Sequence, residues 1–236
     1  MEDRDSSEHL SSSLTDLMTS LMVIFILLLL VFISHTASKD TALRDTLLAK
    51  LQNDKDLIPQ GKDSTPNGFT KDSIKADRNN PDAILVIIPN NLMGFDTEKY
   101  TLKEEGKQFI QNYMPKIASV LCDNASGVDS IVVEGHTDKN KWQGFSDEDS
   151  VNKNLTLSQQ RSMSVVEEAL NVLKEDNRTC FLDKLSATGR GEQGAATPKD
   201  DSRDAAEKAN EASRQVIFRI HVKAHDASSV EQELRK

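Results

Sequence analysis

The sequence is poor in several features that mark common functional classes. Its net charge is −9, from 29 Lys and Arg against 38 Asp and Glu, and no basic cluster is interleaved with aromatic residues. This composition argues against nucleic acid as a partner. No nucleophile-elbow or phosphate-loop motif is present, so we predict that the protein is not an enzyme and has no cofactor. His136 has no second His or Cys at ligand spacing, which favours a hydrogen-bonding role over metal binding.

Cysteine is also scarce, since the chain contains only Cys122 and Cys180. The two thiols could be free and buried, or they could form one disulfide, and their spacing does not decide between these states. An oxidising compartment would favour the disulfide.

Only one apolar run approaches membrane length. Residues 21–33 contain no polar side chain, but at about 1.5 Å per residue they are shorter than a hydrocarbon core of about 30 Å. Extension back to residue 14 gives a full span. We therefore predict a transmembrane helix over residues 14–34, preceded by a short tail over residues 1–13. A cleavable signal peptide is disfavoured because that tail is acidic instead of basic.

Asp16 lies within the predicted span, where an ionised carboxylate costs about 2.5 to 3.5 kcal/mol. Thr19, Ser20 and Val23 follow it at intervals of three, four and seven residues and share its helical face. This polar, small-residue face suits contact with a partner helix. Alternatively, Asp16 caps a helix that begins at Leu17.

The remainder of the chain is long enough for one domain of ordinary size. Residues 35–81 are predicted to contain a helix over 38–52, with Leu43, Leu47, Leu48 and Leu51 on one face, followed by a polar linker over 53–80. Residues 224–236 form a polar tail.

Residues 82–223 alternate β-branched runs with segments of helical periodicity. This order predicts an α/β domain with helices on one face of a small mixed sheet. Predicted strands lie at 83–88, 131–133, 182–188 and 216–222, and predicted helices at 101–121, 157–173 and 205–212. In the second helix, Met163, Val166, Leu170 and Leu173 are predicted to face inward.

Three blocks in this region resemble the signature of OmpA-like peptidoglycan-binding domains: VEGHTD at 133–138, NLTLSQQR at 154–161 and GRGE at 189–192. The resemblance implies that Asp138 and Arg161 bind diaminopimelate of the stem peptide, with Asn154 as a third polar contact or a helix cap. A carboxylate can bind the ammonium group of this amino acid, and a guanidinium can bind its carboxylate. The alternative is a salt bridge between Asp138 and Arg161 without a ligand.

The sequence departs from this signature in two places. Residues 139–153 form a long segment with Trp142 and an acidic run at 147–149, which could alter or partly cover the ligand groove. Ser-Arg-Gln-Val at 213–216 replaces the usual Asn-Arg-Arg-Val and keeps one of its two arginines.

The block DLMTSLM at 16–22 resembles the Asp-x-Met-Thr-x-x-Met segment of MotB-type subunits of ion-driven motors. The resemblance implies that Asp16 carries a proton, or Na⁺, and that Thr19 and Ser20 line the ion path. It also implies a homodimer inside a pentamer of MotA-like subunits. The protein would lie in the inner membrane with a cytoplasmic N-terminus and a periplasmic domain. The leucines between residues 43 and 51 would pair the two copies or plug the path.

The short, acidic tail and the Leu/Ile-rich span are similar to the B subunits of Zorya anti-phage defence systems. A flagellar stator subunit is the second interpretation. A passive membrane-to-wall anchor is the third, and it predicts that Asp16→Asn leaves function intact.

Overall fold

The computed structural model describes residues 3–55, 57–58, 69–200 and 202–223. Within the first helix, side chains are described for residues 15–33 and from residue 43 onward. The predicted tail at 224–236 and part of the predicted linker, residues 59–68, lie outside the described residues.

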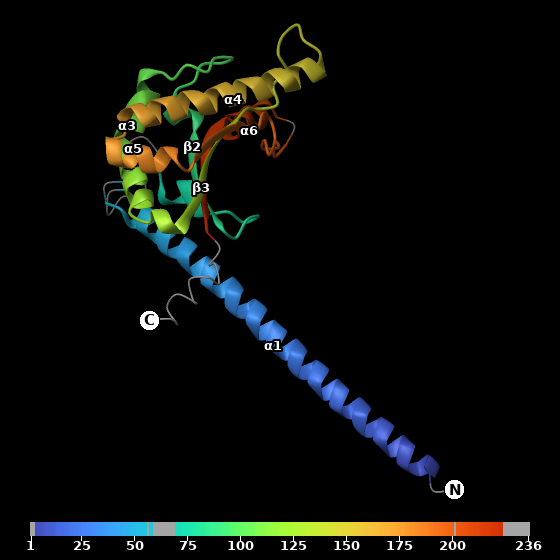
Figure 1. Cartoon of the computed structure of the whole chain (residues 1–236). Coiled ribbons are helices and arrows are strands. Elements are labelled where there is room, and N and C mark those ends of the chain that lie inside the picture. Colours follow the sequence, from blue (N-terminus) through green and yellow to red (C-terminus); the bar gives the residue numbers. More distant parts are fainter. Residues whose placement is uncertain (1–2, 56, 59–68, 201, 224–236) are drawn as a thin grey trace.

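The first helix, α1 (Asp3–Asn53), is one unbroken element of 51 residues, about 76 Å long at about 1.5 Å per residue. It projects from one end of the domain, with its N-terminal end far from the sheet (Figure 1). Residues Thr15–Ile33 are long and apolar enough to span a membrane. Because α1 begins at Asp3, the interpretation of Asp16 as a helix cap is wrong, and the predicted N-terminal tail is helical from residue 3.

The C-terminal end of α1 belongs to the domain core. Leu47 and Leu51 are fully buried there, as are Phe69 and Ile74 from the region that follows. The interpretation of residues 53–80 as a linker without core elements is therefore wrong. The strand in this region, β1 (Ile74–Ala76), has only three residues, which is too few for an alternating pattern to be recognised in the sequence. Isolated buried residues such as Phe69 also give no periodic pattern.

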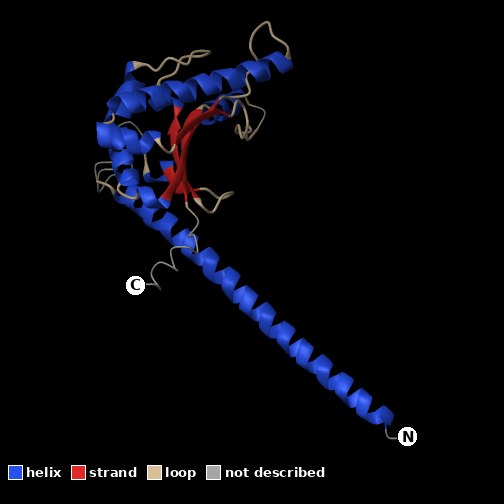
Figure 2. Cartoon of the chain, in the orientation of Figure 1, coloured by secondary structure: helices blue, strands red, loops and turns tan. Residues whose placement is uncertain are grey.

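The sheet has five strands in the order β1-β2-β5-β3-β4 (Figure 2). The strands are β1 (Ile74–Ala76), β2 (Ala83–Pro89), β3 (Val128–His136), β4 (Leu185–Gly189) and β5 (Gln215–Val222). β3 and β4 are parallel, and the other neighbours are antiparallel. All four predicted strands are present, although β4 begins later than predicted because a short helix occupies the residues up to Leu182.

The remaining helices are α2 (Asn90–Met93), α3 (Glu104–Cys122), α4 (Asp147–Val172), α5 (Glu175–Leu182) and α6 (Arg203–Ser213). Figure 1 shows α3, α4 and α5 on one side of the sheet, and α4 contacts β3 and β4 directly. The predicted fold class is confirmed. The prediction for Met163 is wrong, because it is 41% exposed. Val166 and Leu173 are buried as predicted, and Leu170 packs against the core. The buried face of α4 also includes Ser158 and Ser162, whose small side chains let the helix approach the strands.

Successive residues of a strand point to opposite faces of the sheet. The face away from α3, α4 and α5 carries a buried network of charged side chains. Glu134 is 1% exposed and accepts hydrogen bonds from Arg190 and Arg219, while Asp77 pairs with Arg219. Burial alone would raise the pKa of Glu134, but hydrogen bonds from His136 and the two arginines lower it far below its ordinary value. This network joins β1 to the centre of the sheet.

Candidate functional site

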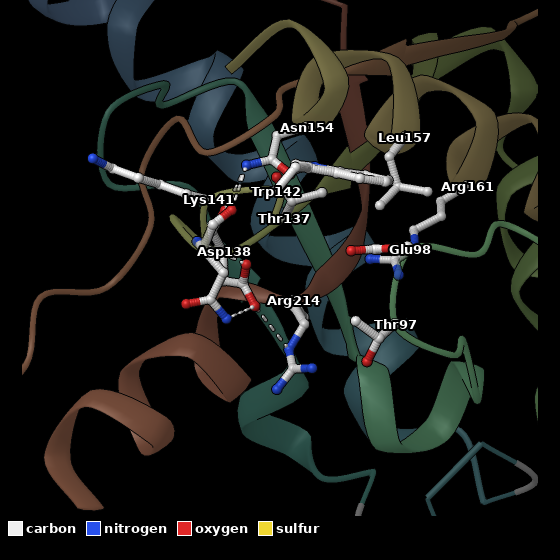
Figure 3. A pocket seen from close by; sticks show the side chains of 11 residues that line it. Thr97, Glu98, Thr137, Asp138, Lys141, Trp142, Asn154, Leu157, Arg161 and Arg214 are labelled. Atoms are coloured by element: carbon white, nitrogen blue, oxygen red, sulfur yellow. Dashed lines mark hydrogen bonds and ion pairs between the residues drawn. The ribbon is translucent and has the colours of Figure 1, made fainter. Parts of the chain in front are cut away.

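A pocket of about 170 Å³ lies where β3 ends and the first turns of α4 begin (Figure 3). It is lined by Thr97, Glu98, Thr137, Asp138, Asn140, Lys141, Trp142, Asn154, Leu157, Arg161 and Arg214. The sequence-predicted residues Asp138, Asn154 and Arg161 all lie in this one pocket.

Close packing of β3 against α4 places the pocket. A Cβ atom on Gly135 would lie 2.0 Å from the backbone oxygen of Ser158, so only glycine permits this approach. Beyond β3, the Thr137 N–H donates to the Gly191 carbonyl at 2.8 Å. This bond holds the residue after β3 against the loop that follows β4. The next residue, Asp138, therefore lies in the lining of the pocket.

The Asp138 carboxylate is held by its own loop and by one arginine. Oδ1 accepts from the Asn140 backbone N–H at 3.1 Å, and Oδ2 accepts from Asn140 Nδ2 at 3.1 Å. Arg214 Nε lies 3.4 Å from Oδ2. Among the described residues no salt bridge joins Asp138 to Arg161, so the predicted ligand-free pair between them is wrong, and the cation beside Asp138 is Arg214.

Arg161 is fixed by the loop before α3. It is only 4% exposed, and its Nε and Nη2 donate to the carbonyls of Lys99 at 3.0 Å and Asp96 at 2.9 Å. Its guanidinium carbon lies 5.1 Å from the centre of the Phe95 ring. Burial lowers the pKa of Arg161 to about 10, an effect that nearby Asp138 opposes. The side chain is therefore still cationic at neutral pH, and neither carbonyl bond uses Nη1.

Asn154 fastens the long loop to α4. Its Oδ1 accepts from Trp142 Nε1 at 2.8 Å, and its Nδ2 donates to the Asn140 carbonyl at 3.2 Å. The suggested cap role is wrong, because Ser146 caps α4 by accepting from the Asp149 N–H. The acidic run at 147–149 forms the first helical turn, where it complements the helix dipole, instead of extending the loop.

Arg214 and Thr137 are pocket residues whose place the sequence did not predict, whereas Trp142 belongs to the segment that was expected to reach the ligand groove. Thr137 Oγ1 is buried and has no hydrogen-bond partner among the described residues, whereas the buried Arg214 Nε is ion-paired with Asp138. Buried polar atoms are rarely left without a partner unless a site requires them. One carboxylate and two guanidinium groups around a small cavity suit a ligand that carries both an ammonium and a carboxylate.

The second predicted site, on α1, lies apart from this pocket. Thr19 Oγ1 donates to the Thr15 carbonyl at 2.7 Å and the Asp16 carbonyl at 3.0 Å, and Ser20 Oγ donates to the Asp16 carbonyl at 2.8 Å. Both hydroxyls thus bind the helix backbone within their own chain. The Asp16 side chain is exposed, as are all described side chains from residue 15 to residue 33.

Cys122 and Cys180 form a disulfide that joins the end of α3 to α5, with their Cα atoms 6.0 Å apart. His136 Nδ1 lies 3.2 Å from the Gln193 carbonyl oxygen, and its Nε2 lies 3.5 Å from Glu134 Oε2. These contacts fit a hydrogen-bonding role for His136. No cluster of three or more potential metal ligands occurs in the described part of the chain.

The sequence profile of the OmpA family matches residues 94–211, which is half of the chain. The chain belongs to the OmpA family. The matched span of this OmpA-family protein runs from the loop that holds Arg161 to the helix before Arg214, and so includes most of the pocket.

The chain is similar to several solved structures of low sequence identity. A putative MotB-like protein from Desulfovibrio vulgaris is 16% identical with a TM-score of 0.50, over 80% of this chain and 98% of that one. The periplasmic domain of Helicobacter pylori MotB is 16% identical with a TM-score of 0.46, over 69% and 96%. The cell wall anchor of the type VI secretion system from Pseudomonas aeruginosa is 17% identical with a TM-score of 0.42, over 64% and 90%. No curated protein matches the chain.

Proposed function

We propose that this OmpA-family protein ties a membrane to the cell wall by binding the stem peptide of peptidoglycan. The observation that carries the proposal is the pocket in which Asp138 and Arg161 are both buried without binding each other. Two opposite charges held apart by separate backbone contacts leave space for a zwitterionic ligand between them.

Diaminopimelate of the stem peptide has the matching groups. Its side-chain ammonium would bind the carboxylate of Asp138, and its side-chain carboxylate would bind the guanidinium of Arg161. Arg214 adds a second cation at the Asp138 end, so it would either bind a ligand carboxylate itself or turn away as the ammonium enters. The unpartnered hydroxyl of Thr137 supplies one further polar contact.

The disulfide and the apolar part of α1 support the expected location. Disulfides persist in oxidising compartments such as the bacterial periplasm, and the bond between Cys122 and Cys180 lies inside the wall-binding domain. Residues 15–33 are apolar but exposed, so they need lipid or another protein around them. We infer a single-pass inner-membrane protein with a cytoplasmic N-terminus and a periplasmic domain.

A second function is favoured by Asp16, which lies inside a helix of membrane length. We infer that the protein is a MotB-like subunit of an ion-driven motor in which Asp16 carries protons, or Na⁺. Two copies would be surrounded by a pentamer of MotA-like subunits. The burial of Leu47 and Leu51 in their own domain argues against pairing of these leucines between copies in this conformation.

Among motors, we propose anti-phage defence of the Zorya type ahead of a flagellar stator. The proposal depends on the acidic character of residues 1–13 and on the Leu/Ile-rich span. A passive anchor is the remaining alternative, since it needs the pocket but not the acidity of Asp16.

Wall binding is tested by sedimentation of the full-length protein, solubilised in detergent, with purified peptidoglycan sacculi. We expect the wild type to sediment with sacculi and Arg161→Ala to remain in solution. Arg178→Ala is the matched control, because Arg178 also donates to a backbone carbonyl but is exposed and lies outside the pocket. Equal sedimentation of Arg161→Ala and wild type would show that this pocket does not bind the wall.

The motor function is tested in cells that carry the native locus, by the efficiency of phage plaquing. Asp16→Asn should abolish protection, whereas Asp45→Asn, an exposed change further along α1, should not. Protection by Asp16→Asn equal to wild type would favour the passive anchor. If the wild type itself gives no protection, swimming motility of the same strains becomes the deciding assay.

A further inference from the structure

A second, wider groove adjoins the pocket. Its volume is about 540 Å³, within the usual range of about 300 to 1,000 Å³ for ligand sites. It shares Glu98, Trp142 and Leu157 with the pocket, so the two cavities lie side by side. The long loop, which was expected to alter or partly cover the ligand groove, supplies Trp142 and Phe145 to the lining of this second groove.

Aromatic rings line this groove from two separate loops. Tyr100 and Phe145 are each 48% exposed, although large aromatic side chains are ordinarily among the more buried residues of a domain. Lys153 Nζ lies 4.1 Å from the centre of the Phe145 ring and 4.9 Å from that of Trp142. These two cation–π contacts hold both rings in place beside α4.

One face of α4 supplies the floor of the groove, with both charged and neutral hydrogen-bonding groups. The groove-lining positions on the helix are Asp149, Asn152, Lys153, Thr156, Leu157 and Gln160. Their spacing of three, four, seven, eight and eleven residues from the first places them in a single stripe. Asn152 and Gln160 add amide groups to this lining, and Thr156 adds a hydroxyl that donates to the Asn152 carbonyl at 3.0 Å and can still accept a hydrogen bond.

We infer that this groove binds the glycan backbone of peptidoglycan next to the stem peptide. The C–H face of a pyranose ring is apolar and can stack on an aromatic ring, whose face carries partial negative charge. The hydroxyl and N-acetyl groups at the sugar's edge match the amides and hydroxyl on α4. The inference rests on the proposed binding of the stem peptide in the adjoining pocket, because the peptide is covalently linked to the sugar and would bring it to the groove.

Binding of two related ligands to the full-length protein tests the inference. The ligands are the diaminopimelate-containing tripeptide alone and the same tripeptide attached to its N-acetylated disaccharide. The protein is kept in a detergent without a sugar headgroup, because a maltoside would compete for the groove. Titration calorimetry should give an affinity about tenfold higher for the disaccharide-tripeptide, the effect expected of two aromatic contacts.

The double variant Tyr100→Ala/Phe145→Ala should lose this advantage and still bind the free tripeptide as the wild type does, since neither residue lines the pocket. Met163→Ala, an exposed apolar change on α4, should keep the advantage. Thermal unfolding of each variant checks that it is folded.

The remaining outcomes separate the two proposals. Equal affinity of the wild type for both ligands would overturn the glycan groove and leave stem-peptide binding standing. An advantage that persists in the double variant would also overturn it, because the sugar would then bind elsewhere. Failure of the wild type to bind either ligand would overturn both proposals.

Discussion

Replacement of Arg161 by lysine separates the need for a guanidinium from the need for a positive charge. In the structure, Nε and Nη2 of Arg161 donate to the carbonyls of Lys99 and Asp96, and Nη1 is not used in these bonds. A lysine has one nitrogen at the end of a flexible chain. That nitrogen cannot bind both carbonyls and a ligand carboxylate at once.

The size of the effect follows from the number of bonds lost. A hydrogen bond to a charged group contributes about 1.5 to 3 kcal/mol, so loss of the bond to the ligand alone should weaken binding about tenfold to 150-fold. If the lysine binds the ligand instead, it leaves the carbonyls of Asp96 and Lys99 without their donor. The loop that carries Phe95 should then lose stability.

The assay is calorimetric titration of the diaminopimelate-containing tripeptide into full-length protein in detergent. Arg178→Lys is the control, because Arg178 makes a similar bond to the Leu170 carbonyl at 3.1 Å outside the pocket. Binding by Arg161→Lys within about twofold of the wild type would refute the reasoning, because a point charge would then be sufficient.

Two further predictions concern stability, and both are measured by thermal unfolding. Glu134→Gln should destabilise the domain at neutral pH by about 1.5 to 3 kcal/mol, because it removes the charged acceptor of two arginines, of which Arg219 keeps its pair with Asp77. The depressed pKa of Glu134 stabilises the fold above the unfolded-state value of about 4.3, and this contribution is lost as pH falls toward the folded-state value. The gap between variant and wild type should therefore narrow below about pH 4, and a constant gap would contradict the assignment. For the disulfide, whose cysteines are 58 residues apart, the chain-entropy model gives about 4 kcal/mol. A reductant should lower the unfolding temperature of the wild type but not of Cys122→Ser/Cys180→Ser, and an unchanged wild type would show that the bond contributes nothing.

The sequence was sufficient to predict the strands and helices whose apolar residues recur with a clear period. The clean alternation in β5 and the β-branched run of β2 predicted strands that the structure contains. β1 was missed because three residues give too short a pattern. Met163 was misplaced because the stripe of α4 that packs on the sheet is centred on serines, which hydrophobic periodicity does not register.

The site was predicted only in part, because some of its contacts depend on the folded chain and leave no local pattern in the sequence. Motif resemblance located Asp138 and Arg161, and both lie in the pocket. Local sequence could not reveal that Arg214 pairs with Asp138, since the two residues are 76 positions apart (214 − 138) and meet only through the sheet. Nor could it reveal that Asn154 binds Trp142, because that contact depends on where the loop folds back on α4.

The continuity of α1 has a mechanical consequence. The same helix contains the apolar segment and, ten residues beyond residue 33, enters the domain and ends with Leu47 and Leu51 in the core. A polar, flexible connector would let the domain reorient freely, whereas this helix contains no such joint. If the pocket binds the wall as proposed, a force applied there would be transmitted along α1 to the apolar segment as torque and tilt.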